Sequence, residues 1–214
     1  PDLRVRFSTS HPKDIHDEVL FVMKRNDNVA KHIHLPAQSG NSRILKKMNR
    51  TYTREWYERK YNRIKEILPN CSVSCDIITG FCSETEDDHK DTLELLVNCP
   101  FEFSYMYYYS ERPGTLAARK YEDDIAEDIK KRRLSEVINV QHDIAKKLNR
   151  AQEGKVHRVL IEMQSKKNEN EWMGRNEQNI KVIFPKDHYN LGDFVDVIIE
   201  RSTTTSLIGK GITK

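Results

Sequence analysis

Polar side chains and glycines follow four strand-like segments in the first half of the sequence. The segments end in Ser8-Thr9-Ser10, Gln38-Ser39-Gly40, Thr79-Gly80-Phe81 and Tyr109-Ser110-Glu111. Hydroxyl and amide groups can bind ribose and amino-acid groups, and a glycine lets a ligand approach the backbone closely. These ends are therefore candidate ligand contacts, with ordinary loop polarity as the alternative. The sequence has no P-loop or dinucleotide-binding glycine pattern.

The elements that must position these side chains alternate between strand and helix. Strand patterns cover 3–9, 30–36, 71–81 and 101–110, and helical patterns cover 11–26, 43–48, 53–68, 83–99 and 123–153. This alternation predicts a parallel sheet with helices outside, in which ligands bind at the carboxyl ends of the strands. Four units are too few for a complete eight-unit barrel. We expect a partial parallel (βα) barrel, the second half of a barrel whose first half is absent.

Helical periodicity predicts the buried faces and the helix starts. Ile15, Val19, Val22 and Met23 fall on one face of the first helix. Thr53 is the expected start of the helix over 53–68, and Ser83 is the expected N-cap of the next helix. In the long helix the expected apolar positions are Ile125, Ile129, Leu134, Val137, Ile138, Ile144 and Leu148.

The sequence pattern changes after Gly154. Five short strand-like runs, separated by Asn, Gly, Pro and Lys, fill the remaining residues. This pattern is typical of a small antiparallel β-barrel of OB-like size. We therefore predict two domains, a partial βα barrel over 1–152 and a small β-barrel over 153–214.

Charge is distributed unevenly along the chain. The net charge is only +3, but residues 1–69 hold 15 Lys and Arg against 8 Asp and Glu, a balance of +7. A basic first third can attract phosphate backbones, and solvated helix faces are the alternative. No apolar run approaches the roughly 20 residues that cross a bilayer, so we expect no membrane contact.

The four cysteines, Cys71, Cys75, Cys82 and Cys99, are predicted to be reduced and structural. Nothing else in the sequence is typical of a secreted protein, which favours thiols and a cytoplasmic location. Cys71 and Cys82 fall at opposite ends of one strand, too far apart to share a metal ion. We therefore expect no metal ligands in this chain.

Four motifs in this order resemble the radical-SAM methylthiotransferases: "RVRFSTSHPKD", "HIHLPAQSGNSRILKKMNRTYTREWY", "DIITGFCSETEDDH" and "YSERPGTLAA". The resemblance extends over essentially the whole chain, and the part after Gly154 is similar to the family's RNA-binding TRAM domain. Arg112-Pro113-Gly114 favours the MiaB-type tRNA branch, which adds a methylthio group to isopentenylated adenosine beside the anticodon. The family usually has Pro-Gly where Cys82-Ser83 stand here.

The resemblance implies a cofactor set and partners. Such enzymes use S-adenosylmethionine and two [4Fe–4S] clusters, an electron donor and the tRNA anticodon stem-loop. The family's Cys-x3-Cys-x2-Cys motif is not in this sequence, so the resemblance implies that the cluster-bearing part is absent and that this chain alone is inactive. The residues expected to face S-adenosylmethionine are Ser8, Ser10, Gln38, Ser39, Gly80, Glu84 and Tyr109.

The expected RNA contacts are basic side chains and one aromatic. Arg43, Lys46, Lys47 and Arg50 are three and four residues apart, so one helical face can carry them. With Arg54 they are the first candidates, and the second domain adds Arg158, Trp172, Arg175, Lys181 and Lys210. Trp172 can stack on a base, although a core position is the alternative.

Two other functions stay open from the sequence. The chain can be a non-catalytic RNA-binding module, or part of a sister methylthiotransferase acting on threonylcarbamoyl-adenosine or a ribosomal protein. A Cys-x3-Cys-x2-Cys motif upstream of Pro1 would decide for the enzyme.

Overall fold

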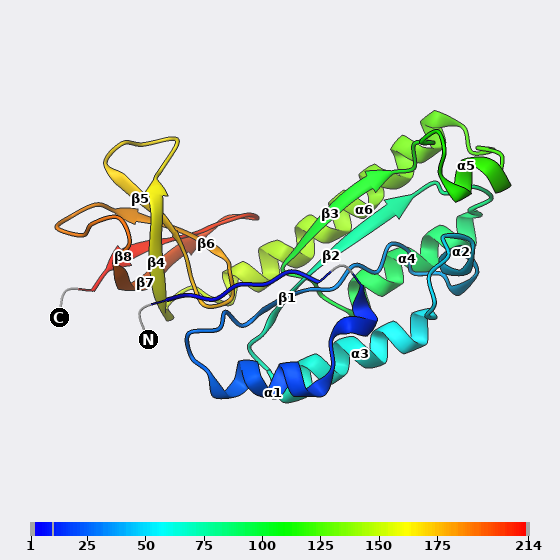
Figure 1. Ribbon diagram of the computed structural model, residues 1–214. Coiled ribbons are helices and arrows are strands. Elements are labelled where there is room, and N and C mark those ends of the chain that lie inside the picture. The colour runs from blue at the N-terminus through cyan, green and yellow to red at the C-terminus, as the bar shows by residue number, and fades with distance from the viewer. Residues whose placement is uncertain (1–2, 10, 213–214) are drawn as a thin grey trace.

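The computed structural model describes residues 3–9 and 11–212 and contains two sheets (Figure 1). The first sheet has strands β1 (His32–His34), β2 (Ser72–Thr79) and β3 (Phe103–Tyr108). The second is a closed barrel of β4 (Val156–Gln164), β5 (Glu171–Arg175), β6 (Lys181–Pro185), β7 (Phe194–Ser202) and β8 (Leu207–Gly211). The helices are η1 (Pro12–Asp14), α1 (Asp17–Arg25), α2 (Ser42–Lys47), α3 (Arg54–Ile67), α4 (Glu86–Asn98), α5 (Leu116–Lys120) and α6 (Glu127–Arg150).

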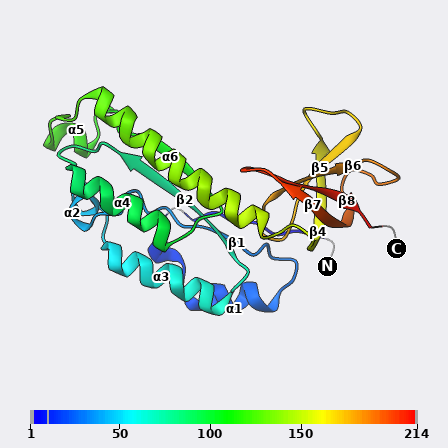
Figure 2. The same ribbon diagram turned by 180° about the vertical axis from the view of Figure 1, so that it is seen from behind.

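The first sheet is parallel, as predicted, with the strand order β1-β2-β3. Its buried face carries Ile33, Val73 and Ile77, and Figure 2 shows α3, α4 and α6 packed on this side. The opposite face, toward the viewer in Figure 1, has no described helix over it. The expected partial βα barrel is confirmed as a parallel sheet with helices on one side.

The strand expected over 3–9 is wrong. Residues 3–9 are extended, but their only described bridge joins Val5 to Val29 beside β1. Val5 exchanges two backbone hydrogen bonds there, from its N–H to Asn28 O (2.8 Å) and from Ala30 N–H to its carbonyl (2.9 Å). One bridge does not make a ladder, so the segment is not a strand of the sheet.

Three expectations for helix ends and faces need correction. The helix expected over 11–26 is broken at Ile15-His16 into η1 and α1, and Val22 is exposed whereas Leu20 is buried. The N-cap of α4 is Thr85, not Ser83, because Thr85 and Asp88 form a capping box. The predicted start of α3 is confirmed, since the Thr53 side chain accepts from Trp56 N–H.

Helix α6 buries a largely polar stripe. The predicted long helix is present, but of its expected apolar positions only Val137 is fully buried. The other expected positions lie half-buried beside the stripe, at the margin of the packed face. The buried stripe is Lys130, Arg133, Val137, Gln141, Ala145 and Asn149, spaced three or four residues apart along the helix.

The five strands of the second half close in the order β4-β5-β6-β8-β7, which confirms the small β-barrel. Val159, Val182, Phe184 and Val197 belong to its core. Helix α6 leads into β4, and the expected boundary at 152–153 falls between these two elements.

The two halves contact one another through polar groups. Lys31 N–H donates to Glu177 O (2.7 Å), and Ser72 Oγ donates to Gln178 O (2.5 Å). At the end of α6, Asn149 Nδ2 donates to Thr203 O (2.9 Å). The first two bonds hold the β5–β6 loop against the amino end of the parallel sheet, and the third joins the β7–β8 turn to α6 (Figure 1).

Candidate functional site

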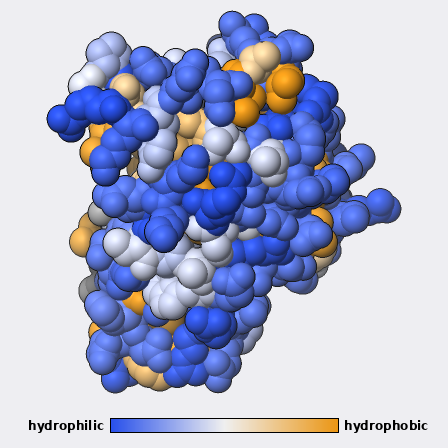
Figure 3. All heavy atoms as spheres, turned by 90° about the vertical axis from the view of Figure 1, so that its right-hand side faces the viewer, coloured by the Kyte–Doolittle hydropathy of each residue, from blue (hydrophilic) through white to orange (hydrophobic). Residues whose placement is uncertain are grey.

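A cavity of about 200 Å³ lies where the three parallel strands end. Gln38, Ile78 and Tyr109 come from the three strand ends, because parallel strands present their carboxyl ends at one edge. The other lining residues are Lys47, Met48, Asn49, Arg50, Phe81, Leu116 and Ala117. Figure 3 shows this end of the molecule as mainly hydrophilic, with an apolar area near the top, at the level of α5 in Figure 1.

Gln38 is fixed by its backbone. Its N–H donates to Asp76 O (2.8 Å), and its carbonyl accepts from Ile78 N–H (2.9 Å). Its φ is +73°, a left-handed conformation that turns the chain out of the strand direction. Asp76 Oδ2 lies 3.5 Å from Gln38 Nε2 and 3.3 Å from His34 Nε2. The amide thus belongs to a polar row that crosses the open face of the sheet.

Tyr109 contributes a phenolic hydroxyl to the cavity, from a different strand end than Gln38. Its ring meets the Phe81 ring edge-on at 4.9 Å, and Lys130 Nζ lies 5.4 Å from its centroid. Burial raises the pKa of Tyr109 to about 12, so the phenol stays protonated at neutral pH and can donate a hydrogen bond.

Glu84 is not in the cavity lining but holds the loop that forms one wall. This carboxylate is buried, accepts from Gly80 N–H (2.9 Å) and pairs with Arg133 (3.1 Å). Burial raises the pKa of Glu84, although Arg133 and the Gly80 N–H favour the charged form. The space in front of Gly80 is filled by Lys130, whose Cγ would lie 2.4 Å from an added Cβ. The sequence-based expectation that a ligand approaches Gly80 here therefore meets a protein side chain instead.

Ser83 occupies a conformation that favours glycine, with φ of +63°. This accounts for the glycine that the resembling family usually has there. Arg43 donates to the Ser83 carbonyl (2.8 Å), Lys47 donates to its hydroxyl, and Asp124 accepts from its N–H (2.6 Å). Two side chains expected to contact RNA therefore hold this loop in place.

Ser39 and Gly40 pack into the protein. Ser39 is buried, and its hydroxyl accepts from Asn41 N–H at 3.2 Å. A Cβ on Gly40 would lie 2.4 Å from Asp91 O and 2.5 Å from Thr92 Cα, both on α4. Gly40 thus permits the close approach of α4, not of a ligand.

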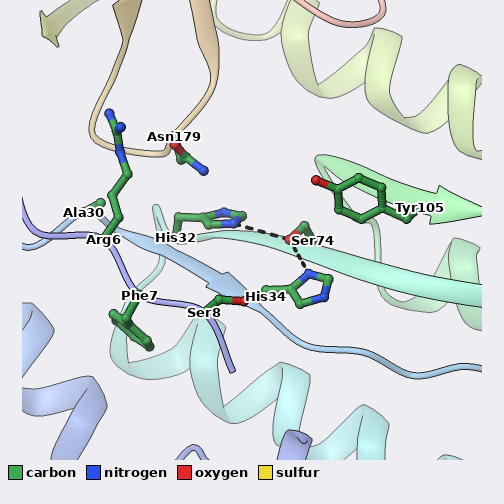
Figure 4. A pocket seen from close by; sticks show the side chains of 9 residues that line it. All are labelled: Arg6, Phe7, Ser8, Ala30, His32, His34, Ser74, Tyr105 and Asn179. Carbon is green, nitrogen blue, oxygen red and sulfur yellow. Dashed lines mark hydrogen bonds between the residues drawn. The ribbon is translucent and has the colours of Figure 1, made fainter. Parts of the chain in front are cut away.

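Ser8 lies elsewhere, in a hollow on the open face of the sheet beside His34 (Figure 4). Ser10 falls outside the described residues. The structure therefore brings Gln38 and Tyr109 together and leaves Ser8 apart from them.

The basic side chains expected to contact RNA around α2 do not act as one face, because some of them form ion pairs within the protein and others do not. Arg43 pairs with Asp88, and Arg54 pairs with Glu58, Asp91 and Glu94. Helix α2 ends at Lys47, so Arg50 does not share its face but lines the cavity. Lys46 is exposed, with no ion pair among the residues that the structure describes.

The predicted RNA contacts of the second half are spread around the barrel. Trp172 is half-buried, donates from Nε1 to Tyr189 O (3.1 Å) and packs on the barrel core. Arg158 and Lys210 are exposed. Arg175 pairs with Glu162 at 3.3 Å, and Arg175 and Lys181 both line a cleft against the parallel sheet.

The four cysteines are buried thiols, and burial raises the pKa of Cys71, Cys75 and Cys99 to about 12. Such thiols are poor cluster ligands, because a ligand must be the thiolate. Within residues 3–9 and 11–212, no three His, Cys, Asp or Glu side chains could hold a metal ion together. No described helix is long and apolar enough to cross a membrane.

Sequence reasoning missed the polar row formed by His32, His34, Ser74 and Asp76, with Tyr105 beside it. His34 Nδ1 lies 2.9 Å from Ser74 Oγ, and His32 Nε2 lies 3.3 Å from the same hydroxyl (Figure 4). The signal was the alternation in "HIH" and "SCD", which places polar side chains on one face of each strand.

Two family models match the chain. The Radical SAM superfamily model matches residues 1–96, and the TRAM domain model matches residues 150–212. The radical SAM match brings with it S-adenosylmethionine and iron–sulfur chemistry as a general property of that superfamily. The expected order of a radical SAM region followed by a TRAM domain is confirmed.

Two curated relatives are named tRNA-2-methylthio-N(6)-dimethylallyladenosine synthase. The one from Amoebophilus asiaticus is 54% identical over 215 residues, which cover 100% of this chain and 44% of the relative. The one from Flavobacterium psychrophilum is 50% identical over 212 residues, which cover 99% of this chain and 44% of the relative. The resemblance to the radical-SAM methylthiotransferases is confirmed, and the chain spans less than half the length of these relatives.

A solved structure supports the fold alone. The Escherichia coli radical SAM enzyme coproporphyrinogen III oxidase matches with a TM-score of 0.50 at 16% identity, covering 78% of this chain and 45% of that one.

Proposed function

We propose that this chain is the part of a radical-SAM tRNA methylthiotransferase that faces S-adenosylmethionine and holds tRNA. The reaction would methylthiolate C2 of N6-isopentenyladenosine next to the anticodon. The observation that carries the proposal is the strand-end cavity, which joins Gln38, Tyr109 and Arg50 in a chain whose relatives carry that name.

The strand-end cavity fits part of S-adenosylmethionine. Ile78, Phe81 and Leu116 give it an apolar side for an adenine ring, whereas Lys47 and Arg50 supply cations for a carboxylate. Gln38 and Tyr109 add an amide and a protonated hydroxyl for ribose or amino-acid groups. When bound beside a reduced cluster, the cofactor would supply the radical and the methyl group. The residues of this chain would bind it and orient it.

The clusters would be held by another part of the same protein. The buried thiols of this chain do not fit them, since no described triad of ligating side chains is present. The two [4Fe–4S] clusters, the electron donor and the cytoplasmic location therefore belong to the proposal for the whole protein.

The RNA partner would be the anticodon stem-loop. Lys47 and Arg50 line the strand-end cavity, the exposed Lys46 precedes Lys47 on α2, and the TRAM region adds cations at the other end of the sheet. Backbone phosphates are attracted by such separated cations, which set affinity and register without reading sequence.

The test is mass spectrometry of tRNA from cells that lack the gene for the protein containing this chain. We expect 2-methylthio-N6-isopentenyladenosine to disappear, to return with the wild-type gene, and to stay at least about 10-fold lower with Gln38→Ala. Gln164→Ala, on the exposed surface of β4, is the matched control and should restore the modification. An unchanged modification in the deletion strain would refute the proposed reaction.

The same samples separate the alternatives. Loss of a methylthio group from threonylcarbamoyl-adenosine would identify the sister tRNA enzyme, and loss from a ribosomal protein would identify the protein-modifying branch. If no methylthio group disappears, a non-catalytic RNA-binding role is favoured.

A further inference from the structure

A second cavity, of about 570 Å³, lies between the amino end of the parallel sheet and the TRAM barrel. We call it the interdomain cleft. Its lining comes from both halves of the chain: His32, Ser72, Ser74, Glu102, Phe103, Tyr105 and Asn149 on one side, and Arg175, Gln178, Asn179, Ile180, Lys181, Thr204 and Thr205 on the other. It continues into a hollow of about 240 Å³ that shares His32, Ser74, Tyr105 and Asn179 with it (Figure 4).

Two aromatic rings are presented to this cleft. Phe103 and Tyr105 lie two residues apart on edge strand β3, so both project from the open face of the sheet. They are 47% and 49% exposed, although large aromatic side chains normally bury most of their surface. Their rings meet edge-on with centroids 4.7 Å apart. The open face of one ring can therefore stack on a planar group while the other ring lies at the edge of that group, and we call this pair the stacking platform.

The floor of the cleft is neutral and polar. His32 and His34 share the Ser74 hydroxyl, at 3.3 and 2.9 Å. Burial, together with the nearby His34, lowers the pKa of His32 to about 4, so its ring is uncharged at neutral pH. The one carboxylate in the lining, Glu102, already accepts from Val73 N–H (2.7 Å) and pairs with Lys65 (3.3 Å).

Two cationic side chains, Arg175 and Lys181, line the rim of the cleft, and both belong to the TRAM domain. Lys181 has no ion pair among the described residues, and Arg175 shares Glu162 with Arg6. Asn179, Thr204 and Thr205 add amide, hydroxyl and backbone groups. A stacking platform, a neutral floor of donors and acceptors, and a cationic rim match a nucleotide better than a peptide or an apolar ligand.

We propose that the interdomain cleft holds one nucleotide of single-stranded RNA, with its base stacked on the open face of Tyr105, the Phe103 ring at the edge of the base, and its phosphate beside Lys181. The cleft volume is in the range of small-molecule sites. Tyr105 lies on β3, four residues before Tyr109, which directly follows that strand, so the two residues are roughly 13 Å apart. The held nucleotide is therefore a neighbour of the one presented to the strand-end cavity. This inference rests on the RNA partner of the proposed function.

The experiment uses the full-length protein and an RNA hairpin with a seven-nucleotide loop, carrying 2-aminopurine at one loop position at a time. We expect its fluorescence to be quenched at one position by the wild-type protein. Tyr105→Leu should remove this quenching and weaken binding about 10-fold. Tyr108→Leu changes the same residue type on the same strand but on the opposite face, and should leave both unchanged.

A second pair of variants tests the phosphate contact. Lys181→Gln should lower the slope of log affinity against log salt by about one, whereas Lys167→Gln, in the exposed β4–β5 loop, is the matched charge control. Circular dichroism and thermal melting check that each variant is folded.

The outcomes distinguish this inference from the proposed function. If the hairpin binds but Tyr105→Leu behaves like Tyr108→Leu, the cleft does not hold a nucleotide. The proposal that RNA is the partner is then unaffected. If the wild-type protein does not bind the hairpin, both the cleft inference and the RNA partner fail. If the quenched base responds to Tyr105→Leu alone, the cleft is the binding site.

Discussion

The two ends of the parallel sheet are built on different physical principles. At the carboxyl end, buried ion pairs fix the loops, with Arg133 on Glu84 and Lys130 on Asp123. At the amino end, histidines and serines share hydrogen bonds beneath exposed aromatic rings. A fixed loop suits a site that must orient one cofactor, whereas an open platform tolerates a base that enters and leaves. The comparison predicts that removing one partner of the buried Arg133–Glu84 pair at the carboxyl end lowers the stability of the fold, whereas removing an exposed aromatic ring at the amino end weakens binding.

The largest expected effect comes from removing the buried cation at the carboxyl end. Arg133→Met leaves the Glu84 carboxylate buried without its partner, while Gly80 N–H remains its only described donor. Loss of one partner of a buried pair costs about 3 kcal/mol or more of the free energy of unfolding. Urea denaturation monitored by circular dichroism measures this loss.

Arg132→Met is the control for that variant. Arg132 is on the same helix and also pairs with glutamates, Glu86 and Glu136, but at the surface. We expect a loss of at most about 1 kcal/mol. Equal losses from the two variants would show that burial of the Arg133 pair is not what fixes this end of the sheet.

The next effect concerns the amino end and depends on pH. Burial lowers the pKa of His32 to about 4, so the folded protein resists a proton that the unfolded chain accepts near pH 6.5. Above that pH the ring is neutral in both the folded and the unfolded state, so it does not change the free energy of unfolding. As the pH falls from about 7 to about 5, the unfolded state gains the proton, and the free energy of unfolding falls by about 2 kcal/mol from this group.

His32→Gln removes this dependence, because glutamine does not titrate. We expect the wild-type protein to lose about 2 kcal/mol more than His32→Gln over that interval, measured by urea denaturation at each pH. Burial also lowers the pKa of His89 and His157, and these groups act equally in both proteins. His188→Gln, at an exposed position, should retain the wild-type slope. Parallel curves for the wild type and His32→Gln would contradict a neutral floor.

The comparison also shows which parts of the site can be predicted from sequence. Gln38 and Tyr109 were predicted and are together, because strand order and parallel pairing place their strand ends at one edge. Gly40 and Gly80 were predicted to face a ligand, but α4 and Lys130 occupy that space. A glycine at such a position indicates that another group approaches the backbone closely. Only the tertiary packing shows whether that group is a ligand or another part of the protein.

Charge misled the sequence interpretation more than hydrophobicity did. Lys130 and Arg133 are typical of a solvated helix face, yet both are buried, since Asp123, just before α6, and Glu84, from a distant loop, pair with them. Arg54 was predicted to contact RNA but is bound to three carboxylates. Helical periodicity locates a cation on a face, whereas the acidic groups that neutralise it come from other segments and leave no local signal.

The smallest expected effect tests Lys46, an exposed cation on α2. Lys46 has no ion pair among the described residues, whereas Lys47 donates to Ser83 and lies over the Tyr121 ring at 5.1 Å. We expect the double variant Lys46→Glu/Lys47→Glu to bind tRNA about 10-fold more weakly, with a salt slope lower by about two. Lys46→Glu alone should give about half of the slope change without altering the melting temperature, because its side chain supports no loop. Filter binding at several salt concentrations measures both, with Lys24→Glu on α1 as the control. An unchanged slope would mean that RNA does not reach the carboxyl end of the sheet. The contrast between the two ends would then be one between a cofactor site and an RNA site.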